Sequence, residues 1–303
     1  MIEVSHGQRD ALIELINIGF GRAAASLSQL TGYRVILEVP QVAIHPLGEL
    51  KEVLGRVVQG EVASVHQVFS GPVAGDALLV GEVYLPTSEL SPWLEVLDLV
   101  FAFELLFSPW DAERLRMAIG PAAELGRVAW VMSNHDFDRL ATRVGPENLR
   151  AAAVLLLTLP GVAFVYQGDE LGLANGPGHE PPFDRAGRDR LRHPMQWEAN
   201  GGFTTGDPWL PLVDPEARNV SDQLADPGSL LNLYRRLIEL RRGLGPGFRL
   251  LDAEPGVVAY ERDGHIVAVN TTAEPRSAPA GEPVLATHAG EGLPAHAALI
   301  VRN

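Results

Sequence analysis

The strongest constraint on the fold is a series of four apolar runs, each of which ends in polar or acidic residues. These runs occupy residues 77–80, 99–103, 128–132 and 162–166, and stretches with helical spacing occupy residues 110–119 and 146–157. Strands that alternate with helices are typical of an α/β fold with a parallel sheet buried on both faces. The polar residues after each run would then gather at the carboxyl edge of the sheet, where such folds place their chemistry.

The polar clusters after these runs follow a defined order along the chain. Glu82 comes first, then Ser133-Asn134-His135-Asp136, then Gln167-Gly168-Asp169-Glu170, and finally Arg192-His193-Pro194-Met195-Gln196-Trp197. In this order the clusters resemble glycoside hydrolase family 13, the α-amylase superfamily, at strands five, seven and eight and the loop beyond. The last cluster resembles the α-glucosidase and oligo-1,6-glucosidase branch. The resemblance covers about residues 77–303 and implies half of a (β/α)8 barrel, strands five to eight, at 81–245. A C-terminal β-sandwich domain is implied at 246–303, with residues 257–270 as its start and 230–242 as the last barrel helix.

This resemblance also implies chemical roles for three residues. Retaining glycosidases need two carboxyl groups about 5 Å apart, one to protonate the leaving group and one to attack the anomeric carbon. By position, Glu82 matches the general acid/base, Asp136 matches a third carboxylate that supports the transition state, and His135 matches a ligand of sugar hydroxyls. The family nucleophile lies in a Gly-x-Arg-x-Asp motif, which this sequence lacks. Loss of one member of a catalytic unit costs on the order of 10⁴- to 10⁶-fold in rate, so we expect no useful hydrolysis of α-glucosides.

The first 80 residues carry a different pattern. On a helix predicted over residues 8–30, Asp10, Glu14 and Asn17 lie within about 60° of one another, as they also would on a solvated helix face. Pro40 follows a predicted strand. The spacing of these four residues resembles the CheC and CheX family of response-regulator phosphatases. It implies a CheC-like α+β half domain at residues 1–80, in which Asn17 orients a water toward an aspartyl-phosphate and Glu14 holds a partner lysine.

The two resemblances together predict a chimera that is joined at Val80, where the CheC-like part stops and the glycosidase-like part starts. Three interpretations remain open. The chain is a glycosidase-family segment that binds an α-glucoside or oligosaccharide, a phosphatase that acts on a phosphorylated chemotaxis response regulator, or a non-functional fusion or assembly artefact. Phosphate release that is lost on Asn17→Ala would single out the second. In every case the open edges of the predicted sheets favour oligomerisation through strand pairing.

Composition limits the classes of binding partner and the cellular compartment that we expect for this chain. The formal charge of −14 over 303 residues disfavours nucleic acid and anionic membranes. The sequence has no cysteine, its first residues lack the features of a signal peptide, and no apolar run reaches the length that spans a bilayer. We therefore expect a cytoplasmic protein with no membrane partner. Neither implied chemistry needs a cofactor on this chain, and His135 with Asp136 lacks a third ligand for a metal, so none is predicted.

Overall fold

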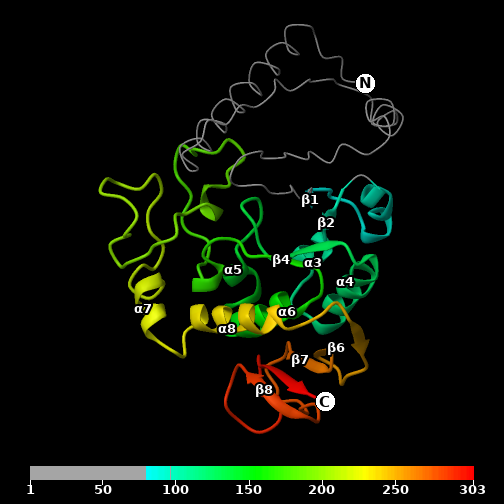
Figure 1. Cartoon of the computed structure of the whole chain (residues 1–303). Coiled ribbons are helices and arrows are strands. Elements are labelled where there is room, and N and C mark those ends of the chain that lie inside the picture. Colours follow the sequence, from blue (N-terminus) through cyan, green and yellow to red (C-terminus); the bar gives the residue numbers. More distant parts are fainter. Residues whose placement is uncertain (1–79, 96) are drawn as a thin grey trace, which may run out of the picture. The chain divides into compact units, whose positions relative to one another are not determined.

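The computed structural model describes residues 80–95 and 97–303, and the statements below concern these residues. Asp10, Glu14, Asn17 and Pro40 lie outside them. A four-stranded parallel sheet in the order β1-β2-β3-β4 forms the first part of the described chain (Figure 1). Its strands are β1 (Val80–Gly81), β2 (Leu99–Phe101), β3 (Val128–Val131) and β4 (Val162–Phe164). Strands β2, β3 and β4 lie within the predicted runs 99–103, 128–132 and 162–166, whereas of the run 77–80 only Val80 belongs to the described residues.

The helices that follow these strands supply most of the core. They are α3 (Phe103–Phe107), α4 (Ala112–Leu125), α5 (Leu140–Val144), α6 (Leu149–Thr158), α7 (Val220–Ala225) and α8 (Leu230–Arg242), and short 3-10 turns include Thr87–Glu89, Ser91–Glu95, Pro146–Asn148, Asp169–Leu171 and Asp189–Leu191. Helix α8 has the predicted bounds. Helix α4 begins at the Asp111 cap and continues past Pro121 to Gly126, where φ is +71°. It is longer than predicted because Ala122, one residue after the proline, packs in the core.

Burial on both sheet faces was expected for every strand, and this is wrong for β4. Each residue of β3 is buried, whereas the side chains of Val162 and Phe164 in β4 are each 37% exposed. In the described sheet β4 is the terminal strand and pairs with β3. A terminal strand has a neighbouring strand on one side, which leaves part of its apolar surface in contact with solvent.

Residues 246–303 were expected to form a β-sandwich, but their named strands form one antiparallel sheet. The strands are β5 (Arg249–Leu251), β6 (Val257–Arg262), β7 (His265–Asn270), β8 (Glu282–Ala286) and β9 (Ala298–Arg302), in the order β5-β6-β7-β9-β8. Side chains alternate between the two faces of this sheet. Tyr260 and Val269 belong to the main core with the helices, whereas Ala259 packs with Leu293 and Ala297 on the other face. Helices therefore take the place of the expected second sheet.

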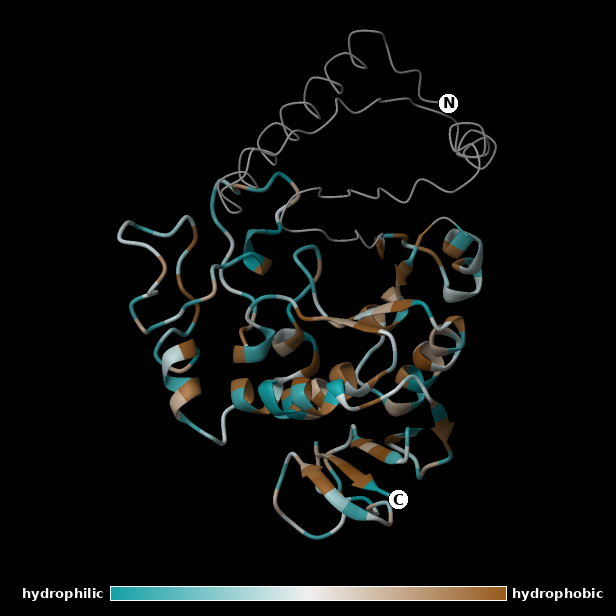
Figure 2. Cartoon of the chain, viewed as in Figure 1, coloured by the Kyte–Doolittle hydropathy of each residue, from teal (hydrophilic) through white to brown (hydrophobic). Residues whose placement is uncertain are grey.

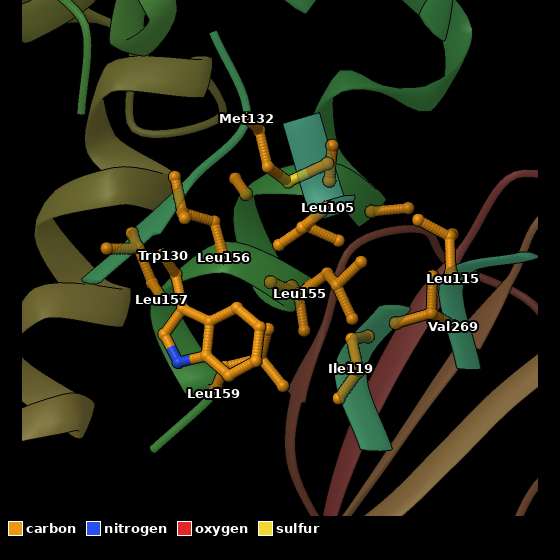
Figure 3. Packing of buried hydrophobic residues seen from close by; sticks show 14 of the residues in the cluster. Leu105, Leu115, Ile119, Trp130, Met132, Leu155, Leu156, Leu157, Leu159 and Val269 are labelled. Atoms are coloured by element: carbon orange, nitrogen blue, oxygen red, sulfur yellow. The ribbon is translucent and has the colours of Figure 1, made fainter. Parts of the chain in front are cut away.

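The parallel sheet, the helices and the C-terminal sheet share one hydrophobic core. Figure 3 shows Trp130 of β3, Leu155 of α6 and Val269 of β7 in the same cluster. In Figure 2 the strands of both sheets are mostly apolar, whereas the loop segments are mostly polar. None of the described helices combines the length and apolarity needed to cross a bilayer. The predicted boundaries at residues 80/81 and 245/246 remain predictions.

Candidate functional site

The segment that follows β1 carries Glu82 at the carboxyl edge of the parallel sheet. The hydroxyl of Tyr84 donates a hydrogen bond to Oε1 of Glu82 over 2.9 Å, and the Tyr84 ring stacks on Phe103 with centroids 4.3 Å apart. Burial, then the hydrogen bond to Glu82 and the negative charges of Glu82 and Asp136, raises the pKa of Tyr84 to about 12. The Tyr84 ring centroid also lies 6.1 Å from that of Phe137, the residue after Asp136, so Tyr84 connects the segment of Glu82 with the loop that carries Asp136.

The loop after β3 holds His135 and Asp136 through a local turn. Oδ1 of Asn134 accepts hydrogen bonds from the backbone N–H groups of Asp136 and Phe137, both over 2.9 Å. Such bonds from an asparagine side chain to the backbone two and three residues ahead define the path of a loop. One residue earlier, the Ser133 hydroxyl donates to Oδ2 of Asp169 over 2.5 Å and ties this loop to the segment after β4.

Two arginines from the segment before α7 converge on one oxygen of Asp136. Nη1 of Arg188 lies 2.5 Å and Nη2 of Arg192 lies 3.1 Å from Oδ1 of Asp136, and Nε2 of His135 lies 3.4 Å from the same oxygen. Arg188 also donates to both carboxylate oxygens of Asp184, over 2.7 and 3.0 Å. This contact holds the pKa of Asp184 well below its usual range. The site is therefore a network of matched charges.

A buried arginine holds together the loops that carry the candidate site. Arg139 is fully buried, donates to the carbonyl oxygens of Gln167 and His193 over 2.7 and 3.0 Å, and lies 4.7 Å from the centre of the Tyr166 ring. Burial lowers the pKa of Arg139. Since Nη1 and Nη2 donate to backbone carbonyls of two different segments, Arg139 holds the segment after β4 and the loop around His193 to the segment after β3.

The structure brings Glu82, His135 and Asp136 to the same edge of the sheet, and the roles predicted for them stay predictions. Glu14 and Asn17 lie outside the described residues. The sequence interpretation missed Tyr84 and assigned no function to Arg188 or Asp184. The i,i+4 spacing of Asp184 and Arg188 was a usable signal for their ion pair, whereas the contact of Arg188 with Asp136 spans 52 positions and has no local pattern.

Another acidic side chain at the carboxyl edge, Glu104, has a structural function. Glu104, directly after β2 in α3, accepts hydrogen bonds from the backbone N–H and the hydroxyl of Thr87, over 3.2 and 2.7 Å. These bonds fix the segment that leads away from Glu82. Across residues 80–95 and 97–303, no three histidine or acidic side chains are grouped as metal ligands.

Comparisons with known proteins agree with this arrangement. A family model described as "Alpha amylase, catalytic domain" matches residues 61–244, more than half of the chain and from an earlier start than the predicted residue 77. The chain is 29% identical over 249 residues to an oligo-1,6-glucosidase of Halalkalibacterium halodurans, covering 62% of this chain and 44% of the relative. It is 36% identical over 168 residues to maltase A1 of Drosophila melanogaster, covering 46% of this chain and 29% of the relative.

Solved structures show the same likeness. The trehalulose synthase MutB from Pseudomonas mesoacidophila MX-45 has a TM-score of 0.65 and 26% identity, over 75% of this chain and 55% of that one. The chain spans less than half of the length of the two relatives above. Its fold is of the α/β type found in α-amylases. The match over residues 61–244 and these likenesses place the chain in the α-amylase family.

Proposed function

We propose that the described part of the chain binds α-glucosides at the edge that carries Glu82 and Asp136. The observation that carries this proposal is Tyr84, whose hydroxyl donates a hydrogen bond to Glu82 and whose ring centroid lies 6.1 Å from that of Phe137, next to Asp136. A carboxyl donor and a second carboxylate at one site are what sugar hydroxyls and a glycosidic oxygen require. The similarity to oligo-1,6-glucosidases and a maltase supports the same class of ligand.

In this proposal each polar residue has a separate task. Glu82 is the general acid/base and Asp136 accepts hydrogen bonds from sugar hydroxyls beside His135. MutB, a relative of known structure, has been crystallised as an E254Q mutant with sucrose, which supports a sugar ligand for this fold. No aspartate of this chain fits the family pattern of the nucleophile. We therefore propose that the chain binds the sugar but does not hydrolyse it at a measurable rate.

The test is calorimetric titration of the whole chain with maltose, together with release of nitrophenol from nitrophenyl-α-glucoside. We expect maltose to bind to the wild type, to lose at least tenfold in affinity on Asp136→Asn because a charged acceptor is lost, and to give no measurable nitrophenol release. Asp138→Asn is the matched control, since Asp138 lies two residues away and pairs with Arg190. Nitrophenol release that Glu82→Gln abolishes would contradict the low turnover, and maltose binding that survives Asp136→Asn would contradict the site.

The phosphatase interpretation of Glu14 and Asn17 is a second proposal that rests on motif spacing alone. Both residues precede residue 61, where the match to the α-amylase family model begins. We also propose the chimeric join at Val80 and the half barrel. The join rests on the two sequence resemblances alone, and the half barrel is also consistent with the four parallel strands of the described sheet.

A further inference from the structure

Three aromatic rings in the segment between β4 and α7 form an exposed surface near the candidate site. The ring of His179 stacks on Phe183 with centroids 3.8 Å apart and planes inclined by 20°, and the centroid of Trp209 lies 5.9 Å from that of Phe183. Phe183 is 54% and Trp209 52% exposed. In Figure 1 this segment runs from green to yellow before α7. We call His179, Phe183 and Trp209 the aromatic triad.

The backbone that presents Phe183 is held by a buried carboxylate. Asp189, which is 1% exposed, accepts hydrogen bonds from the backbone N–H groups of Phe183 and Asp184 over 2.7 and 3.0 Å. Nδ1 of His179 donates to the carbonyl oxygen of Pro181 over 2.6 Å, which fixes the second ring. Rings that are already fixed lose little conformational entropy when a ligand covers them.

One buried histidine joins the two ends of the triad. His193 is fully buried, with Nε2 2.8 Å from the carbonyl oxygen of Pro177 and Nδ1 2.7 Å from that of Pro211. Pro177 precedes His179 by two residues and Pro211 follows Trp209 by two residues, so His193 connects the chain on both sides of the aromatic surface. The exposed rings are consequently part of a supported segment.

The triad is continuous with the charged network around Asp136. Phe183 is followed in the chain by Asp184, which binds Arg188, and Arg188 in turn binds Asp136. A pyranose ring has an apolar face of C–H groups and a rim of hydroxyls. Aromatic rings match the apolar face because their own faces carry partial negative charge, and adjacent carboxylates and guanidinium groups match the rim.

We propose that the aromatic triad is a binding surface for the sugar rings of an α-linked gluco-oligosaccharide beyond the ring held at Asp136. This inference extends the proposed function, since it names an oligosaccharide as the ligand and assigns its distal rings to His179, Phe183 and Trp209. Phe183 is covered by His179 on one side, and the exposed part of its ring together with Trp209 receives the distal sugar.

The experiment is calorimetric titration of the whole chain with glucose, maltotetraose and isomaltotetraose. We expect at least one tetrasaccharide to bind more tightly than glucose. Trp209→Ala and Phe183→Ala should each weaken that tetrasaccharide by about tenfold, as removal of a contact aromatic typically does, and leave glucose affinity unchanged. Phe203→Ala is the matched control, because Phe203 is an exposed aromatic of the same segment that lies outside the triad. Thermal midpoints equal to the wild type would show that the variants are folded.

The outcomes separate this inference from the proposed function. Tetrasaccharide binding that is lost on Asp136→Asn but unchanged in both triad variants overturns the triad and leaves the proposed function in place. Tetrasaccharide binding that survives Asp136→Asn but is lost in the triad variants overturns the proposed function and leaves the triad in place. A wild type that binds neither tetrasaccharide overturns the inference, as does a concentration-dependent dimer that Trp209→Ala dissociates, because the rings would then be covered by a second copy.

Discussion

At the residue scale, Asp169 makes the folded state sensitive to pH. Its side chain is buried after β4 beside Ser133, and burial raises its pKa from an ordinary 3.8 to about 7. Between these values the native state binds more protons than the unfolded state, so the free energy of unfolding falls as pH rises from about 4 to 7. At 1.36 kcal/mol per pKa unit, the full effect is on the order of 4 kcal/mol.

Asp169→Asn tests this behaviour, because an amide keeps a hydrogen-bond acceptor for Ser133 and has no charge to bury. We expect the variant to gain stability relative to the wild type as pH rises from 5 to 8, measured by urea unfolding at each pH. Asp138→Asn, which replaces a partly exposed carboxylate, is the control and should show no such trend. Wild-type and Asp169→Asn curves that run parallel with pH would contradict the buried-acid explanation.

At the scale of the elements, two arginines complete the carboxyl end of α6. Nη1 of Arg241 in α8 donates to the carbonyl oxygens of Leu157 and Leu159, both over 2.7 Å. Nη1 of Arg262 in β6 donates to those of Thr158 and Leu159, both over 2.8 Å. The last carbonyls of a helix have no partner within it and carry partial negative charge, so the two guanidinium groups stabilise this end.

Arg262→Met should therefore destabilise the protein strongly, because it leaves several buried carbonyl groups without their donor. At about 1–3 kcal/mol for each buried group that loses its partner, we expect a loss on the order of 3 kcal/mol and a lower urea midpoint with an unchanged m-value. Arg302→Met, on an exposed side chain of β9 in the same sheet, should change the midpoint little. Equal midpoints for the two variants would show that the donated bonds contribute nothing.

The elements themselves were largely predictable from the sequence, and their long-range contacts were not. Apolar runs located β2, β3 and β4, because a buried strand is apolar along its length. The bounds of α8 came from the family resemblance. The exposure of β4 depends on which strands pair with it, and the single C-terminal sheet depends on helices that cover Tyr260 and Val269. At the site, Glu82 and Asp136 were recognisable from their motifs. Arg188, the partner of Asp136, is 52 positions away, a separation at which sequence patterns carry no signal.

At the scale of the whole molecule, the shared core predicts that the C-terminal sheet is required for folding. A variant that ends at residue 245 lacks Arg262 and the strand residues that pack with α4 and α6. We expect it to bind a hydrophobic dye and to unfold on heating without a cooperative transition, because apolar helix surface stays exposed. Circular dichroism melts beside the full chain would measure this. A cooperative transition in the shortened variant would instead support an independent domain boundary at 245/246.

Helix α6 also has a consequence for the synthesis of the protein. Every residue of α6 except Arg150 is buried, yet Arg262, which binds its carboxyl end, is made 104 residues after Thr158. At about 5–20 residues per second on the ribosome, the apolar surface of α6 would stay exposed for on the order of 5–20 seconds until the C-terminal sheet that packs on it is synthesised. During that interval the nascent chain offers a binding site for chaperones, so production of soluble protein should depend on the supply of chaperones that hold unfinished chains.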